Sequence, residues 1–502
     1  MKFKIFAILF ALVVILSSAM GHTQTQVAYG INVQASGVKA DGVTNATPAL
    51  QALINANLTG AFYFAPGTYV LNNNGVNTPG LLLQGFSGTI IMAKGASFAC
   101  NTATTNAGQC IFVINSSGAS FQNLTITYTN VGKLPMARTS AVSNALLVEN
   151  SANISFFNTT IIGSTGSGIW NTNSTSIAYN GTTSITGTTA DGIHFENVGA
   201  GSVAALVTNG TGDDAIGDTN IATTNPNCGL TVSSAQITNS YSRGIAVAGG
   251  CNAVFSNVVI NGTANSALAA SQDQSVSSRV PTNVKFQNVV ASGVGTVKST
   301  VGGNGYCIDI GEATYVTAFN VTCANSRQDG VFVYGGANNV VVQDVVLQTS
   351  SNNGFQSAGA TNVSFIDDES IAAVNNGFDI EQSTNVTLNT CQTQNAGGYG
   401  FYHSSSSNVV ESSLTALNAA GTGGNHRAWW AESMTGPITA SAVSVVDNRS
   451  AASGYVVGDY NLGGNAVVLN GLLFTIAHGT GTVSKNDSSA TYYTYGQLGQ
   501  EW

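Results

Sequence analysis

The sequence predicts an all-β protein built as a parallel β-helix, in which short strands wind into stacked coils. Apolar and polar residues alternate between Gly, Asn and Ser, and no helical periodicity accompanies them. A repeat of about 23 residues is clear in the C-terminal half, where glycines recur at steps of 24, 23 and 23 and Asn-Val pairs at steps of 23. The repeated residues are Gly330, Gly354, Gly377 and Gly400, and Asn339, Asn362, Asn385 and Asn408.

A unit of this length cannot bury its apolar face alone. Stacking the units buries that face, with strands ~4.8 Å apart along the axis. Equivalent Asn side chains then form a column and hydrogen-bond from coil to coil, which satisfies their amides. A leucine-rich repeat is the alternative fold, but the Leu spacing that it requires is absent from this sequence. A β-propeller would need longer repeat units.

The composition agrees with this class and limits the function. The chain has 502 residues, of which 43% are hydrophobic and only 7% charged, so it is not a disordered chain. Its net charge of −9 and pI near 4.9 argue against nucleic acid as a partner. An anionic substrate would depend on a few local basic residues. We expect a monomer that uses no cofactor and no metal.

Residues 1–21 are predicted to be a signal peptide. Lys2 and Lys4 give a basic start, and residues 5–16 form an apolar run too short to span a bilayer comfortably. Ala19 and Gly21 supply small residues for cleavage after Gly21. We therefore expect a secreted protein, extracellular or periplasmic, that has no stable membrane insertion after cleavage. A retained N-terminal anchor is the alternative.

The seven cysteines suit an oxidising compartment. Their spacing makes three disulfides plausible, and buried unpaired thiols are the alternative. The pairs would be Cys100 with Cys110, Cys228 with Cys251, and Cys307 with Cys323, which leaves Cys391 over.

Residues 22–84 are predicted to close the N-terminal end, and residues 85–502 to form the coils and a C-terminal tail. Thr47 can cap a helix, Pro48 suits its first turn, and an apolar stripe follows at Leu50, Leu53 and Ile54. Such a helix would cover the core and strand edges that an open end exposes. The stretch "FYFAPGTYVL", residues 62–71, reads as strand, turn and strand.

Residues 31–71 carry three consecutive motifs: "KADG", a capping helix and "FYFAPGTYVL". Together they resemble the start of the pectate-lyase-like β-helix superfamily, although Ala40 stands where Gly is usual. The resemblance implies a single-stranded right-handed parallel β-helix with a short N-terminal capping helix. It implies no single activity, because this fold carries hydrolases, lyases, epimerases and phage adhesins.

Two acidic motifs lie one coil apart, "TADGI" with Asp191 and "GDDAI" with Asp213 and Asp214. We expect these three carboxylates on neighbouring coils, on an exposed strip where Gly192 and Gly212 allow tight bends. Their mutual repulsion should leave at least one of them protonated near neutral pH. An acid beside bases is what cleavage of a glycosidic bond requires. Asp-Gly turns without chemistry are the alternative.

The two motifs resemble the signature of glycoside hydrolase family 28, the polygalacturonases and rhamnogalacturonases. There, Asn-Thr-Asp-Gly is followed one coil later by Gly-Asp-Asp-Cys-Ile. The resemblance implies an inverting hydrolase of a pectin-like polysaccharide, with Asp214 as general acid and Asp191 and Asp213 as water-activating bases.

The chain departs from that family at two further motifs. "SRGIAV" has Arg243 where the family has His, and the Arg-Ile-Lys motif that grips a uronate has no clear match, although Arg279 and Lys285 lie in the area. These departures put galacturonan specificity in doubt. We retain Arg243 as a candidate substrate-binding residue.

Two further substrate-binding candidates follow from strand alternation. If Ile169 and Ile193 face inward, Trp170 and His194 face outward in one column beside the acids. Trp170 could then stack on a sugar ring, and His194 could bind a hydroxyl group. The alternatives are a Trp that covers an apolar patch and an ordinary surface His.

Three readings of function result. The favoured one is a glycoside hydrolase that uses Asp191, Asp213 and Asp214. The second is a polysaccharide lyase, in which the acids hold Ca²⁺ and Arg243 takes the proton. The third is a non-catalytic, glycan-binding or adhesive β-helix, which the C-terminal series of Ser-, Asn- and Gly-rich coils favours.

Overall fold

The computed structural model describes residues 30–73, 78–102, 109–128, 144–221, 228–272, 279–298, 303–419, 427–447, 455–460, 462, 465–476, 481–484, 488 and 490–493. The predicted signal peptide and its cleavage site lie outside these residues.

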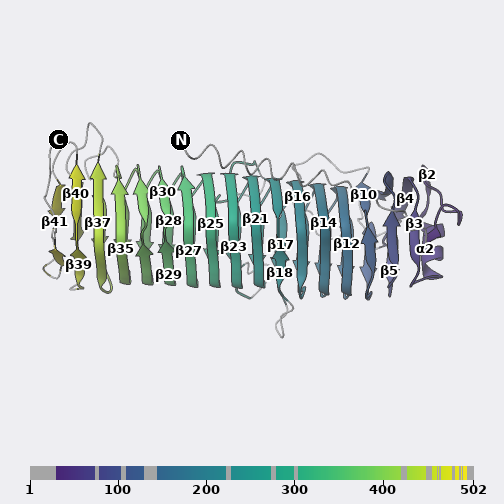
Figure 1. Ribbon diagram of the computed structural model, residues 1–502, viewed down its shortest axis with the longest axis horizontal. Helices are drawn as coiled ribbons and strands as arrows, with labels where there is room; N and C mark the ends of the chain where they lie inside the picture. Colours follow the sequence, from purple (N-terminus) through teal and green to yellow (C-terminus); the bar gives the residue numbers. More distant parts are fainter. Residues whose placement is uncertain are drawn as a thin grey trace.

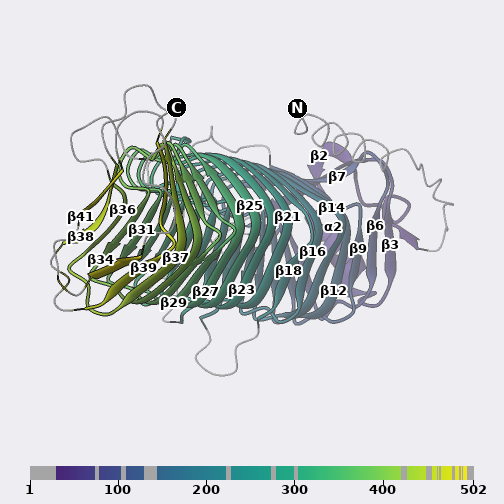
Figure 2. The ribbon, with the colours of Figure 1, turned by 60° about the vertical axis from the view of Figure 1, so that its left-hand side comes forward.

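The chain forms a long parallel β-helix, as predicted (Figure 1). Its strands stack side by side along the long axis, with helix α2 (Thr47–Asn55) at one end and the last strands at the other. The turned view shows the coils winding around a common interior (Figure 2). The strands form two sheets, of 26 strands (sheet A) and 16 strands (sheet B), and paired strands run parallel throughout the described coils.

The strands of sheet A are β1 (Ile31–Asn32), β2 (Asp41–Asn45), β3 (Ala61–Phe64), β4 (Gly67–Asn73), β6 (Thr89–Met92), β7 (Ala96–Thr102), β9 (Ser120–Gln122), β10 (Thr125–Tyr128), β12 (Ala152–Ser164), β14 (Thr175–Thr188), β16 (Gly201–Thr211), β18 (Leu230–Val232), β19 (Ala235–Ser240), β21 (Cys251–Thr263), β23 (Thr282–Val294), β25 (Thr314–Ser326), β27 (Asn338–Gln348), β29 (Thr361–Ile366), β30 (Glu369–Ile371), β32 (Thr384–Asn389), β33 (Gln392–Gln394), β35 (Ser407–Leu417), β37 (Ile438–Asp447), β39 (Val467–Asn470), β40 (Leu473–Ile476) and β42 (Ala490–Tyr493).

The strands of sheet B are β5 (Leu81–Gln84), β8 (Ile111–Ile114), β11 (Leu146–Glu149), β13 (Ile169–Thr172), β15 (Ile193–Glu196), β17 (Ile216–Thr219), β20 (Ile245–Ala248), β22 (Leu268–Ser271), β24 (Ile308–Gly311), β26 (Val331–Tyr334), β28 (Phe355–Ala358), β31 (Phe378–Glu381), β34 (Phe401–Ser404), β36 (Arg427–Glu432), β38 (Tyr455–Tyr460) and β41 (Gly481–Ser484).

One hydrophobic core runs through the interior of the coils. Inward residues of successive strands stack on one another, so equivalent rings lie in rows. Phe355, Phe378 and Phe401 stack with ring centroids 4.5 and 5.2 Å apart. These distances are close to the spacing of parallel strands, because each coil adds one ring to the row.

The N-terminal end is closed by α2, whose Leu50 and Ile54 are buried. The predicted cap was wrong in one detail: Thr47 is the first helical residue, not the cap. Its backbone N–H donates to the side chain of Asn45 at 3.0 Å, and its hydroxyl accepts from the backbone N–H of Asn72 at 3.1 Å. Strands β3 and β4 form the predicted strand-turn-strand and pair directly with β6 and β7 of the coils.

The Asn column is confirmed. Side-chain amides donate from Asn362 to Asn339 at 3.3 Å, from Asn385 to Asn362 at 2.9 Å and from Asn408 to Asn385 at 3.1 Å. These residues also have φ between 53° and 57°, in the left-handed region that Asn tolerates better than most residues. Asn is therefore selected both by the ladder of amides and by the backbone.

Replacing Asn385 separates these two contributions. Asn385→Gly keeps the positive φ but removes two ladder hydrogen bonds, and should lower the free energy of unfolding by about 1 kcal/mol. Asn385→Leu adds left-handed strain and should lower it by a further ~1–2 kcal/mol. Urea unfolding of both variants measures the difference. Equal losses would show that the backbone conformation is not what selects Asn.

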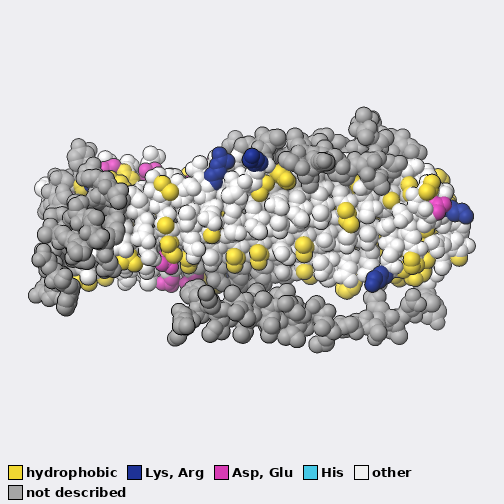
Figure 3. Space-filling model, turned by 90° about the horizontal axis from the view of Figure 1, so that it is seen from above, with side chains coloured by type: hydrophobic (Ala, Val, Ile, Leu, Met, Phe, Trp, Pro, Cys, Tyr) yellow, Lys and Arg dark blue, Asp and Glu magenta, His cyan; other side chains and the backbone are white. Residues whose placement is uncertain are grey.

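The three disulfides are confirmed as Cys100–Cys110, Cys228–Cys251 and Cys307–Cys323, and Cys391 is a buried free thiol. The surface seen from above is mainly uncharged, with isolated hydrophobic side chains and few ionised groups (Figure 3). Among the described residues, no helix has the length and apolar character to cross a membrane.

Candidate active site

The predicted acids meet at the turn that leads from sheet A into sheet B. Asp191 lies between β14 and β15, Asp213 and Asp214 lie between β16 and β17, and Arg243 lies between β19 and β20. Ile193, Ile216 and Ile245 pair in register just after these turns, so the turns stack on three consecutive coils. One carboxylate oxygen from each of the three Asp lies within 4.8 Å of the others. The predicted clustering is therefore confirmed.

Two glycines make this stacking possible. A Cβ atom on Gly192 would lie 2.6 Å from the carbonyl oxygen of Ala215, and one on Gly212 would lie 2.4 Å from the carbonyl of Thr189. Both distances are too short for a side chain, so the Asp-Gly and Gly-Asp sequences are needed for the coils to approach.

Asp214 is bound by Arg243 of the next coil. Arg243 donates from its backbone N–H and from Nε to Oδ1, both at 3.0 Å, and from Nη2 to Oδ2 at 2.8 Å. Burial alone would raise the pKa of Asp214, but the charge and hydrogen bonds of Arg243, aided by Ser242, hold that pKa below its usual value. Asp214 is therefore an ionised carboxylate. This low pKa argues against the general-acid role that the family resemblance implies for Asp214.

Asp191 is held from two sides. Its Oδ1 accepts the backbone N–H of Asp214 at 3.1 Å, and its Oδ2 lies 2.6 Å from Nδ1 of His194. The other ring nitrogen of His194 lies 2.8 Å from the hydroxyl of Thr219. Burial lowers the pKa of His194, but the hydrogen bond and charge of Asp191, with the charges of Glu196 and Asp214, outweigh this and raise it.

Trp170 and His194 do form one column on the outer side of sheet B, as predicted. Their rings are stacked, with centroids 3.9 Å apart and planes 8° apart. His194 is only 5% exposed, so the expected surface position is wrong: the half-buried Trp170 packs on one face of its ring. A protonated His194 would be stabilised by this ring as well as by Asp191.

The expected exposed strip is also wrong, since Asp191, Asp213 and Asp214 are 3%, 8% and 5% exposed. Burial strengthens the interactions between their charges. Within the cluster, Asp191 faces His194 and Asp214 faces Arg243. Asp213 is the most exposed of the three and the one that a ligand would reach first.

Two residues near the cluster were not predicted. Thr219 binds His194, and Asp218, beside it in β17, pairs with the core residue Phe195 and faces the interior. Burial raises the pKa of Asp218 to about 7. Strand alternation from Ile216 was the available signal, because it places Asp218 inward and Thr219 outward. Lys285, by contrast, lies in β23 of sheet A and not at this turn.

The spacing of the acids would suit a cation, but their contacts do not. Both oxygens of Asp214 accept hydrogen bonds from Arg243, and both oxygens of Asp191 are engaged, by Asp214 and by His194. A Ca²⁺ ion prefers six to eight oxygen ligands and would have to displace Arg243. The donor set therefore fits an internal ion-pair cluster better than a calcium site.

Sequence comparisons agree with this architecture. Residues 30–268 match the family model "Rhamnogalacturonase A/epimerase, pectate lyase-like", and residues 282–426 match "Right handed beta helix region". The chain is a right-handed parallel β-helix protein whose residues 30–268 are pectate-lyase-like. Family 28 is not singled out by these matches. Among curated proteins, none matches the sequence significantly.

Several solved structures resemble this chain at low sequence identity. The pre-mature bacteriophage phi29 gene product 12 has a TM-score of 0.61 and 14% identity, over 96% of this chain and 75% of that one. The mannuronan C-5 epimerase A-module from Azotobacter vinelandii has a TM-score of 0.36 and 12% identity, over 92% and 99%. A GH87 alpha-1,3-glucanase from Streptomyces thermodiastaticus has 0.34 and 14%, over 80% and 69%. At 14% identity, the likeness to the phage protein shows a shared fold alone.

Proposed function

We propose that this β-helix is a secreted carbohydrate-active enzyme, a glycoside hydrolase that cleaves a pectin-like polysaccharide at the Asp191, Asp213 and Asp214 cluster. The observation that carries the proposal is that three carboxyl groups lie within 4.8 Å of one another, with Asp191 against His194 and Asp214 against Arg243. Unequal environments are how carboxyl groups are divided into acid and base. The match of residues 30–268 to a rhamnogalacturonase and epimerase family model supports a carbohydrate substrate.

The contacts revise the roles that the family resemblance implied. In our proposal Asp213 donates a proton to the glycosidic oxygen as the bond to the anomeric carbon breaks. Asp191 accepts the proton of the attacking water, and Nδ1 of His194 stabilises the Asp191 carboxyl group. Asp214 stays ionised and holds Arg243, whose side chain is 18% exposed and is the candidate contact for the substrate. One water is consumed: its oxygen bonds to the anomeric carbon, and the proton taken by Asp191 is released to solvent, from which Asp213 recovers its own proton as the products leave.

The spacing bears on the stereochemical course. Most inverting enzymes separate their two carboxyl groups by about 6.5–9.5 Å, which leaves room for water between them. The group here is tighter, within 4.8 Å between nearest oxygens. If the enzyme inverts the anomeric centre, as the family resemblance implies, the attacking water must lie beside the acid and base carboxyl groups rather than between them. NMR of the first anomer released tests this.

The lyase reading is less well supported by the contacts. It needs Arg243 as a base and the acids as calcium ligands, whereas Arg243 is engaged in a bidentate pair with Asp214. A guanidinium fixed by a carboxylate is a poor proton acceptor.

A panel of pectic and neutral polysaccharides tests the proposal. The purified chain should release reducing ends from at least one of them, without a product that absorbs in the near ultraviolet and without sensitivity to chelator. An absorbing, unsaturated product would establish the lyase reading instead. Binding without either product would establish the non-catalytic reading.

A further inference from the structure

On the outer face of sheet A, Tyr315 has a backbone conformation that is unfavourable for its bulky side chain. By strand register, Tyr315 occupies the place of Asn283 on the preceding coil and Asn339 on the following coil. Tyr315 shares their left-handed backbone, with φ 58° against 57° and 56°. For a bulky residue this conformation is a true outlier, and such outliers gather at functional sites.

Nothing in the packing compensates for this conformation. Tyr315 is 59% exposed, so little of its ring is buried. It also interrupts the amide ladder, which runs from Asn283 to Asn252 at 2.7 Å on one side and from Asn362 to Asn339 at 3.3 Å on the other. An Asn at this position would relieve the backbone and offer an amide to the ladder. Stability alone would therefore select Asn over Tyr.

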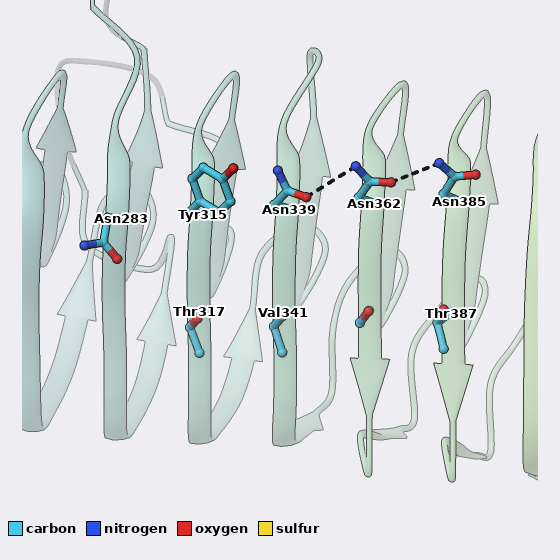
Figure 4. Close-up of a pocket in the computed structure, with 9 residues that line it drawn as sticks. Asn283, Tyr315, Thr317, Asn339, Val341, Asn362, Asn385 and Thr387 are labelled. Carbon is cyan, nitrogen blue, oxygen red and sulfur yellow. Dashed lines mark hydrogen bonds between the residues drawn. The ribbon is translucent and has the colours of Figure 1, made fainter.

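A groove runs beside this ring along the coils (Figure 4). Its volume is about 630 Å³, and the side chains that line it are amides, hydroxyls, one valine and Tyr315. Figure 4 shows the amides in a row with the Tyr315 ring in the same row, and Thr317, Val341 and Thr387 one row below. All of these lining groups are uncharged at neutral pH. The amides repeat once per coil, at the ~4.8 Å spacing of parallel strands.

We propose that this groove is a second, non-catalytic binding site for a neutral oligosaccharide that lies along the helix axis. The ring of Tyr315 would stack on one sugar, and the amides and hydroxyls of successive coils would bind the hydroxyl groups of the sugars that follow. Aromatic rings with a polar rim suit sugars, which have an apolar face and a polar edge. A uronate chain would find no cationic side chain among the lining residues.

The site is separate from the acid cluster. The groove lies on β23, β25, β27, β29 and β32 of sheet A, whereas the acids lie at the turns that enter β15 and β17 of sheet B. The inference does not depend on the hydrolase proposal: a glycan could be held here whether or not the acids cleave one.

Tyr315→Asn is a sharp test, because it should weaken ligand binding while it raises the stability of the fold. The probes are xylohexaose, cellohexaose and mannohexaose, with hexagalacturonate as the charged counterpart, measured by calorimetry in the Asp213→Asn background to limit cleavage. At least one neutral hexasaccharide should bind, and Tyr315→Asn should weaken it at least tenfold while raising the melting temperature. Tyr315→Phe keeps the ring, and its dissociation constant for the same hexasaccharide should stay within about threefold of that of the protein with Tyr315.

Val341→Arg is a second variant that fills the groove and leaves Tyr315 in place. It should also weaken binding at least tenfold. The proposal is overturned if no neutral hexasaccharide binds, if hexagalacturonate binds best, or if binding survives both Tyr315→Asn and Val341→Arg. It is also overturned if Tyr315→Asn lowers the melting temperature, because Tyr315 would then be a structural residue.

Discussion

Asp213→Asn should lower turnover by roughly 10²–10⁴-fold on whichever polysaccharide the protein cleaves, because general acid catalysis contributes about that much. Asn has the shape of Asp but cannot donate a proton to the leaving oxygen with the acidity of a carboxyl group. The fold should survive this nearly isosteric change at the most exposed member of the cluster. Initial rates of reducing-end release, together with melting temperature, measure both effects.

Asp214→Asn should behave differently. It removes the carboxylate from a buried bidentate pair with Arg243, and breaking such a pair typically costs about 3–5 kcal/mol. We therefore expect Asp214→Asn to lose stability as well as turnover, unlike Asp213→Asn. Asp367→Asn is the matched control, since Asp367 is exposed and distant in the sequence, and Asn tolerates its φ of 55°.

The pair of variants can refute the assignment of roles. If Asp213→Asn keeps full turnover, the proton donor lies elsewhere and the cluster is a set of structural ion pairs. If Asp214→Asn keeps its stability but loses all turnover, Asp214 is the acid after all, and the family resemblance described its role better than the contacts do.

The fold was largely predictable because a β-helix converts sequence steps directly into spatial neighbours. A step of 23 residues from Asn362 to Asn385 is one coil, so the column could be derived without coordinates. The same rule brought Asp191 and Asp213 together, and close sequence spacing gave the disulfides. No long-range pairing had to be guessed, because each coil contacts the next one along the chain.

The environment of the acids was not predictable in the same way. Side-chain alternation along the strand predicts that His194 points outward, but it does not predict that Trp170 covers the His194 ring or that Asp191 binds it. Likewise, Arg243 was placed near the acids, but a repeat cannot show that its side chain turns back to Asp214. Burial and ion pairing depend on side-chain directions at Gly-containing bends, where the period of two no longer applies.

The protein should be more stable at pH 5 than at pH 8. Five Asp side chains carry raised pKa values, chiefly because burial disfavours their ionised form: about 7 for Asp218 and Asp379, about 6 for Asp309 and Asp329, and well above the usual value for Asp368. In Asp218, Asp309 and Asp379 one carboxyl oxygen has no hydrogen-bond partner among the described residues. The folded state is therefore most stable when these carboxyl groups are protonated.

The direction follows from proton linkage. An unfolded Asp releases its proton near pH 3.8, whereas Asp218, Asp379, Asp309 and Asp329 keep theirs until about pH 6 to 7. Between those values the folded state binds more protons, so stability is fully present below about pH 4 and falls as the pH rises to about 7. Each pKa unit corresponds to about 1.4 kcal/mol, so a shift from 3.8 to about 6 or about 7 corresponds to roughly 3–4 kcal/mol for each group. His194, whose pKa is also raised, adds a loss of the same sign above pH 6.5.

Thermal unfolding between pH 4.5 and 8 tests this expectation, and the melting temperature should fall by several degrees across the range. Asp218→Asn replaces the deeply buried carboxyl by a neutral side chain of the same size. It should raise the melting temperature at pH 8, change it little at pH 4.5, and so flatten the profile. A wild-type melting temperature that is constant or rises toward pH 8 would show that these carboxyl groups ionise within the fold without cost. In that case water or a bound cation must reach them, and the interior face of β17 would be less dry than its burial indicates.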